Sequence, residues 1–163
     1  MGEGQKMNAV SYRLRLTEPS DFDQWLPLWE GYQRFYHLEI SERVTQTTWQ
    51  RFHDDSELMH CAVVERTAQG QAEPAKLVGM VHYIFHRSCW TAGDYCCLQD
   101  LFTYVDLRGQ GIGRMLIEHV YAQAAKQGAA RVWWLTHESN QQAMYLYDRI
   151  ADRSGFIQYR KVL

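Results

Sequence analysis

Residues 98–114 read Leu-Gln-Asp-Leu-Phe-Thr-Tyr-Val-Asp-Leu-Arg-Gly-Gln-Gly-Ile-Gly-Arg, and this stretch decides the fold prediction. It begins inside a strand predicted over 95–102, and its glycine-rich turn leads into a helix predicted over 111–127. Glycines here allow a tight turn with free backbone amides, and the helix dipole adds positive potential. Arg108 and Arg114 add cationic side chains. The stretch therefore predicts a turn that binds a phosphate or diphosphate.

Two other phosphate-binding patterns do not fit this turn. A dinucleotide-binding turn has Gly-x-Gly-x-x-Gly after the first strand of a parallel unit, whereas position 114 is Arg and three antiparallel strand candidates come first. The phosphate loop of nucleoside triphosphatases needs Gly-Lys followed by Ser or Thr, which is not present here. A turn that only joins a strand to a helix is the alternative interpretation.

The residues after the turn predict a parallel crossover. Residues 131–136 (Arg-Val-Trp-Trp-Leu-Thr) are typical of a strand, and a helix between two strands normally makes them parallel neighbours. Ser139 and Gln142 fit a capping box that begins a last helix, expected to run to about 154. Gly155 then precedes a final strand predicted over 156–162.

The residues before the turn predict an antiparallel meander with two helices. The aromatic residues of the first helix recur every three or four positions, which gives it a wide apolar face. The expected elements are a strand over 12–16, a helix from Ser20-Asp21, a helix over 41–53, and strands over 60–65 and 76–85 joined by a loop at 68–74. The whole is a mixed α/β fold, β-α-α-β-β-β-α-β-α-β, in which the antiparallel meander is followed by the parallel β-α-β crossover.

Composition limits the functional classes. The 163 residues are 46% hydrophobic and 22% charged, which predicts one domain over 1–163 with a flexible N-terminus at 1–9. A formal net charge of -2 gives no reason to expect nucleic acid or a membrane as partner. Without a signal core or membrane-length apolar run, we expect a cytoplasmic protein. The four cysteines are interpreted as free thiols, and histidine spacing predicts no metal site.

The turn resembles the acyl-coenzyme A signature of the GNAT superfamily of N-acetyltransferases. That signature has Arg or Gln, two free positions, Gly, one free position, then Gly or Ala, and Arg108, Gly111 and Gly113 match it. The strand before the turn is similar to that of the histone and diamine acetyltransferase-like branch. The last helix is also similar, at Asn140, Ala143, Leu146 and Tyr147. The resemblance implies transfer of an acetyl group from acetyl-CoA to a primary amine, with coenzyme A as product.

The same resemblance implies roles for individual residues. Backbone groups of Leu101, Phe102 and Thr103 would pair with the pantetheine amides as an added strand does, and one of their N–H groups would polarise the thioester carbonyl. Asn140 and Ala143 would line the pantetheine arm, and Tyr147 would lie beside the sulfur. Helical spacing independently puts these three on one face. The diphosphate would contact Arg108, Gly109, Gln110, Gly111, Ile112, Gly113 and Arg114.

Acetyl transfer needs a group that accepts the amine proton and one that protonates the leaving thiolate. Tyr147 is the predicted acid, because a phenol has a pKa of about 10 and a thiol one of about 8.5. Asp100 is the predicted base or ammonium anchor, and a carboxylate that only caps a neighbouring loop is the alternative. The similar diamine acetyltransferases have Glu-Asp where this chain has Gln99-Asp100. Since Gln99 cannot take a proton, an ordered water relay is the other possibility.

The acceptor site is expected between the first helices and the strand loops. Trp29, Tyr32 and Tyr36, with Gln99 and Asp100, are the candidate substrate residues, because aromatic faces and carboxylates attract a cation. Core packing is the alternative for Trp29 and Tyr32. A polyamine, another small amine and a protein lysine remain open as acceptors, and a non-catalytic acyl-CoA-binding module is the alternative function. The unpaired final strand predicts a homodimer.

Overall fold

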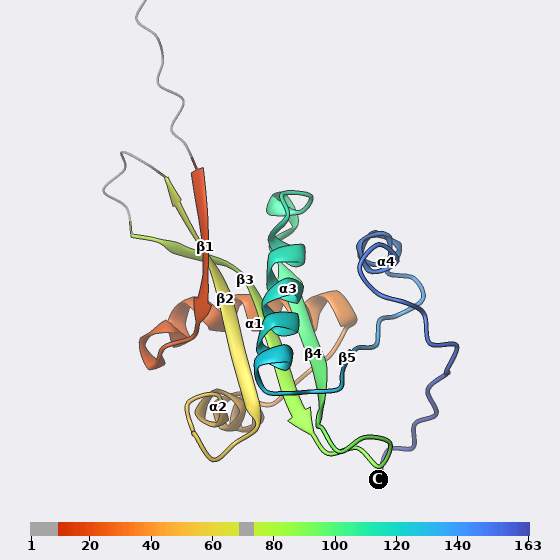
Figure 1. Ribbon diagram of the computed structural model, residues 1–163. Helices are drawn as coiled ribbons and strands as arrows, with labels where there is room; N and C mark the ends of the chain where they lie inside the picture. The colour runs from red at the N-terminus through yellow and green to blue at the C-terminus, as the bar shows by residue number, and fades with distance from the viewer. Residues whose placement is uncertain (1–9, 69–73) are drawn as a thin grey trace, which may run out of the picture.

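A computed structural model describes residues 10–68 and 74–163, and its centre is a five-stranded sheet in the order β1-β2-β3-β4-β5 (Figure 1). The first four strands are antiparallel to their neighbours, and β5 is parallel to β4. The strands are β1 (Val10–Leu16), β2 (Met59–Ala68), β3 (Lys76–His86), β4 (Tyr95–Thr103) and β5 (Arg131–Trp133). This mixed α/β sheet, a meander followed by a parallel crossover, confirms the predicted fold class.

Helices cover both faces of the sheet (Figure 1). Helix α3 (Ile112–Lys126) packs on one face, where Leu116, Ile117 and Val120 are fully buried. Helices α1 (Phe22–Tyr36) and α2 (Glu42–Arg51) pack on the other face around the buried Trp25. Short 3-10 turns precede α1 at Pro19–Asp21 and α3 at Val105–Leu107. Each helix therefore buries the apolar face that its residue spacing predicts.

The last helix is much shorter than predicted. Helix α4 covers Gln141–Tyr147, and its N-cap is Asn140 without a side-chain hydrogen bond. The predicted capping box is wrong, because the Ser139 hydroxyl pairs with His137 Nδ1 at 2.7 Å and Gln142 Oε1 accepts from Arg108 at 3.2 Å. Beyond Tyr147 the carbonyl of Ile150 accepts a hydrogen bond from the Tyr121 hydroxyl of α3 at 2.9 Å. The amides of residues 148–151 still donate to carbonyls of α4, but the chain does not continue as a helix to 154.

The predicted final strand is also wrong. Residues 156–162 form no strand, and Phe156 and Tyr159 are 77% and 89% exposed. A strand needs a partner for its backbone groups, and the predicted 131–136 strand forms only over Arg131–Trp133. The predicted flexible N-terminus at 1–9 and positions 69–73 of the loop predicted over 68–74 lie outside the described residues. None of the described helices is both long and apolar enough to cross a membrane.

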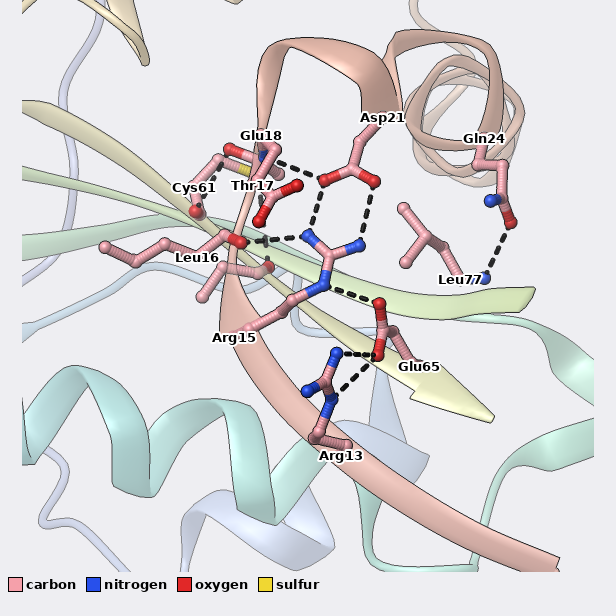
Figure 2. A network of polar contacts seen from close by, with 11 residues as sticks. Arg13, Arg15, Leu16, Thr17, Glu18, Asp21, Gln24, Cys61, Glu65 and Leu77 are labelled. Carbon is pink, nitrogen blue, oxygen red and sulfur yellow. Dashed lines mark hydrogen bonds and ion pairs between the residues drawn. The ribbon is translucent and has the colours of Figure 1, made fainter. Parts of the chain in front are cut away.

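A chain of charged side chains, of which Asp21 and Glu65 are buried, joins β1, β2 and the turn before α1 (Figure 2). Arg15 donates two hydrogen bonds to Asp21, at 2.5 and 2.8 Å, and a third to Glu65 at 2.5 Å. Arg13 reaches the other oxygen of Glu65 at 2.9 Å. These guanidinium groups hold the pKa of both carboxyls below the usual range, although burial alone would raise it. The network fixes where the chain enters α1 and thus where α1 crosses the sheet.

Candidate active site

The glycine-rich turn exposes a row of free amides at the start of α3. Gly109 and Gly111 have positive φ values of 78° and 85°, a conformation that side chains rarely adopt. The first helical hydrogen bond runs from the Met115 amide to the Gly111 carbonyl at 3.0 Å. Within the described chain, the amides of residues 109–114 donate no hydrogen bond of good distance and angle. The predicted phosphate-binding turn therefore has the donors that a diphosphate requires.

Side chains around the turn leave its backbone open. The Tyr12 hydroxyl of β1 donates to Gln110 Oε1, and Arg114 lies 3.6 Å from Glu118, so both side chains of the turn have partners in the protein. A Cβ added at Gly109 or Gly111 would meet no atom within 4 Å. Ile112 is buried in the core under α3, so only its amide can face a ligand. The predicted contacts of Gln110 and Ile112 are therefore available through the backbone.

The sheet separates next to this turn. Parallel pairing between β4 and β5 begins at Tyr95 with Arg131 and ends at Cys97 with Trp133. Strand β4 continues for six more residues to Thr103 without β5 beside it. The edge of β4 over 98–103, which includes Leu101, Phe102 and Thr103, therefore has room for an added strand on the β5 side.

A β-bulge at Gln99 reverses the faces of β4. On β3, His82 pairs with Asp100 and the next residue, Tyr83, pairs with Leu98, so Gln99 is the extra residue. Leu98 packs in the core under α3, whereas Phe102 packs in the core under α1 and α2. Without the bulge, residues 98, 100 and 102 would share one face. The bulge leaves Gln99 exposed and turns Asp100 toward α1.

Asp100 lies in a pocket of polar and aromatic groups. It is 8% exposed, and its Oδ2 is 2.9 Å from His82 Nδ1. His82 Nε2 in turn accepts from the Trp25 indole at 3.0 Å. The sequence analysis did not identify Trp25 or His82 as site residues, and its only signal was a histidine inside an otherwise apolar strand. Among the described residues, Asp100 accepts no hydrogen bond from a loop amide, which disfavours the loop-capping alternative.

Tyr32 lies beside Asp100, and two more predicted residues, Tyr36 and Tyr147, lie near Tyr32. Burial raises the pKa of Tyr32, and the negative charge of Asp100 raises it further, with smaller effects of Tyr36 and Tyr147. The rings of Tyr32 and Tyr36 lie 5.1 Å apart. Burial, together with Tyr36, raises the pKa of Tyr147 to about 12. The phenol of Tyr147 is thus protonated at every ordinary pH.

Trp29 is buried among other aromatic side chains of the core. Its indole donates to the Thr45 hydroxyl of α2 at 3.2 Å, and it is 5% exposed. It stacks between Trp25 and Tyr32, with ring distances of 6.1 and 5.4 Å. These contacts favour the alternative interpretation, in which Trp29 is a core residue. Its ring stacks against Tyr32 and so helps to hold that residue in place.

A cavity of about 510 Å³ lies between the C-terminal end of α1, where Tyr36 lines it, Arg108 before the glycine turn, and residues 137–142 before and at the start of α4. Asn140 lines it and donates to the Tyr36 hydroxyl and to Thr136 Oγ1, both at 3.3 Å. Arg108 also lines it, with its guanidinium over the ring of Phe35 and its Nε 3.5 Å from the Thr103 carbonyl at the end of β4. The cavity therefore lies between Arg108 and the start of α4, next to the end of β4.

The comparisons with known proteins agree with this geometry. Residues 22–151 match the model of the Acetyltransferase (GNAT) family. The D-amino-acid N-acetyltransferase of Saccharomyces cerevisiae is 31% identical over 159 residues, which cover 98% of this chain and 96% of that protein. The chain belongs to the GNAT acetyltransferase family. It is therefore an N-acetyltransferase, and acetyl-CoA is the acetyl donor of this family.

Other GNAT members share the fold. The thialysine N-epsilon-acetyltransferase of Mus musculus is 29% identical over 112 residues, or 65% of each chain. The solved structure of a ribosomal-protein-alanine N-acetyltransferase from Brucella melitensis superposes with a TM-score of 0.72 and 16% identity, covering 94% of this chain and 99% of that one. The solved structure of a probable acetyltransferase superposes with a TM-score of 0.76 and 19% identity, covering 93% of this chain and 97% of that one. These structures support the fold of this GNAT chain and not its substrate.

Proposed function

We propose that this chain transfers the acetyl group of acetyl-CoA to the primary amine of a small, amino-acid-like molecule. One observation carries the proposal: the free edge of β4 runs from the glycine-rich turn, whose amides donate no hydrogen bond among the described residues, back to Asp100, and Tyr32 lies near both Asp100 and Tyr147. Acetyl-CoA supplies the thioester carbonyl that an amine attacks. A binding site for a diphosphate, an extended arm and a reaction centre thus follow one another along a single strand.

The residues of the turn and of β4 hold the coenzyme in this proposal. Amides of residues 109–114, with the guanidinium of Arg108, bind the diphosphate. Backbone groups of Leu101 to Thr103 pair with the amide arm, on the edge that β5 leaves open. Asn140 and the small Ala143, both half-buried at the start of α4, border the arm from the other side. Arg108 must leave the Thr103 carbonyl when that backbone group is used.

Asp100 and Tyr147 divide the proton transfers. Asp100 attracts the ammonium of the acceptor and takes its proton, directly or through one water, because Gln99 is exposed and has no basic group. Tyr147 donates a hydrogen bond to the leaving thiolate. Its pKa of about 12 makes it a weaker acid than a thiol of pKa about 8.5. The phenol therefore donates a hydrogen bond to the thiolate and keeps its own proton. Tyr147 thus stabilises developing charge, and the thiolate can leave before it is protonated.

The acceptor pocket favours a small cation. Tyr32 lies beside the buried Asp100, and its ring is 5.1 Å from that of Tyr36, an arrangement that suits a compact ammonium. Two relatives are acetyltransferases of D-amino acids and of thialysine, which are also small amines. We therefore place amino acids and their amine analogues ahead of polyamines and protein lysines.

Release of free thiol from acetyl-CoA tests the proposal. The purified chain is mixed with acetyl-CoA and, in turn, D-amino acids, L-amino acids, thialysine, polyamines and a lysine-rich peptide, and the acetylated product is identified by mass spectrometry. Amine-dependent thiol release with at least one small amine is expected. Binding of acetyl-CoA without release for any amine would instead identify a non-catalytic acyl-CoA-binding module. Preference for the peptide would reject the small-amine assignment.

We also propose that two copies of the chain associate through residues 156–163. Phe156, Ile157, Tyr159 and Val162 are exposed and apolar, and Phe156 contacts Trp90 with ring centroids 6.3 Å apart. In Figure 1 this segment extends from α4 toward the loop between β3 and β4. Edge strand β5 has no strand partner on its outer side among the described residues. A second copy can cover both the segment and this edge.

A further inference from the structure

Both ring nitrogens of a histidine buried in β3 are in hydrogen bonds. His82 is 2% exposed, with Nε2 at 3.0 Å from the Trp25 indole and Nδ1 at 2.9 Å from Asp100 Oδ2. An indole N–H can only donate, so Nε2 must carry the lone pair that accepts it. The proton of the neutral ring is therefore on Nδ1, where it is donated to Asp100. Trp25 thus selects the tautomer of His82.

We propose that His82, with its tautomer set by Trp25, is a positioning residue that orients the Asp100 carboxylate for the acceptor amine. The inference rests on the proposed function, because it assigns His82 to the same reaction centre. One carboxylate oxygen is tied to the histidine on the core side. In this proposal the other oxygen binds the ammonium and takes its proton, beside the Tyr32 hydroxyl, which also interacts with Asp100. His82 acts through Asp100 and does not itself touch the acceptor.

The surroundings of Asp100 make this hydrogen bond important. The titratable groups that face it are Tyr32 from α1, Cys61 from β2, Cys97 from β4 and His82 itself. Burial raises the pKa of Tyr32 and Cys61 and brings that of Cys97 to about 11. These three groups are therefore neutral at pH 7 and cannot balance a carboxylate by charge. The fixed N–H of His82 is then the donor that stabilises the ionised form from the core.

The tautomer can be read directly in the wild-type protein. Two-bond proton–nitrogen correlation spectra of histidine rings, recorded without any ligand between pH 6 and 8, distinguish the two tautomers. We expect a His82 pattern with a protonated Nδ1 and an unprotonated Nε2. An Nε2-protonated ring or an imidazolium in that range would overturn the inference, whatever the activity of the enzyme.

Two variants test the effect on the reaction. His82→Leu fills a similar volume without a donor, whereas His82→Asn places an amide N–H near the position of Nδ1. For His82→Leu we expect kcat/KM to fall by roughly 10- to 100-fold and the acid limb of the pH–rate profile to move up by about one pH unit. His82→Asn should stay within about threefold of wild type with the limb unmoved. Thermal melting of both variants checks that they fold.

The outcomes separate this inference from the proposed function. If the wild type is active and His82→Leu leaves the acid limb of the pH–rate profile where it is, the positioning role of His82 is overturned and the proposed function stands. If both variants lose kcat/KM equally and their pH–rate profiles keep the wild-type acid limb, His82 has only a structural role, and the positioning role is overturned as well. Wild type that releases no thiol with any amine would reject the proposed function, while the ring spectrum would still decide the hydrogen bond between His82 and Asp100.

Discussion

The ring of Phe102 in β4 lies directly against the backbone of Gly31 in α1. A Cβ placed on Gly31 would come within 2.6 Å of Phe102 Cζ, a distance that real Cβ atoms do not reach. Phe102 is buried in the core under α1 and α2, so its ring cannot move aside freely. This contact sets how closely α1, which carries Tyr32 and Tyr36, approaches the strand that carries Asp100.

Gly31→Ala should therefore destabilise the protein, although alanine is normally the better residue inside a helix. Overpacking against Phe102 is expected to lower the free energy of unfolding by about 1–3 kcal/mol. Gly113→Ala is the matched control, because its Cβ would meet only Leu146 Cδ2 at 3.7 Å. That variant should be neutral or gain up to about 1 kcal/mol. Urea denaturation of both variants measures the difference, and a stabilised Gly31→Ala would refute the close contact.

Tyr147→Phe should lower turnover while binding stays intact. Removing the hydroxyl removes the proposed donor to the thiolate, and we expect kcat to fall roughly 100-fold with the Kd for acetyl-CoA changed less than about threefold. Tyr145→Phe is the control, because Tyr145 is exposed and its hydroxyl bonds Arg149. Steady-state kinetics and calorimetry measure the two quantities. Wild-type turnover in Tyr147→Phe would reject Tyr147 as the donor.

Gly111→Asp should abolish acetyl-CoA binding, because a negative charge would enter the cradle of amides at the start of α3. Gly111→Asn has nearly the same shape and tolerates the positive φ of 85° at this position. We therefore expect the asparagine variant to lose less than about tenfold in affinity, while the aspartate variant shows no measurable binding. Equal affinities in the two variants would remove this turn from the coenzyme site.

Arg15→Met should destabilise the protein by about 3–5 kcal/mol at pH 7, because the buried Asp21 would lose its arginine partner and the buried Glu65 would keep only Arg13. Arg13→Met should cost at most about 1 kcal/mol, since Arg13 is 72% exposed. The folded-state pKa of both carboxyls is lowered, so their stabilising effect is present above the unfolded values near pH 4 and is lost at lower pH. Thermal unfolding from pH 7 to pH 3 should show the gap between wild type and Arg15→Met closing. A gap independent of pH would contradict this.

Removal of residues 156–163 should convert a dimer into a monomer. Sedimentation velocity of the wild type is expected to give twice the mass of the 19.2 kDa chain, and the shortened chain the mass of one copy. The exposed apolar side chains of this segment are the physical reason. A monomeric wild type, or a dimer that survives the removal, would contradict association through this segment.

The local patterns of the sequence were enough to predict the α/β order, the glycine turn at the start of α3 and the apolar faces of α1 and α3. These features depend on residues within one or two turns of each other, and their periodicity is visible in the chain. The same local reasoning put Tyr147 and Asn140 on one helix face, but Asn140 is the N-cap of α4 and lies outside its helical residues. It also failed beyond Tyr147, where α4 ends and the Ile150 carbonyl accepts from Tyr121 in a different helix.

Only the tertiary structure decided which way Asp100 points. Strict alternation along β4 would put Asp100 on the same face as Leu98, and the bulge at Gln99 exists only in the register between β4 and β3. The partnership of Trp25, His82 and Asp100 follows from that register, because it joins residues up to 75 positions apart along the chain. The lost final strand has the same cause, since a strand forms where a partner backbone lies beside it. Alternation in the chain can show that a segment is able to be a strand, but not what it pairs with.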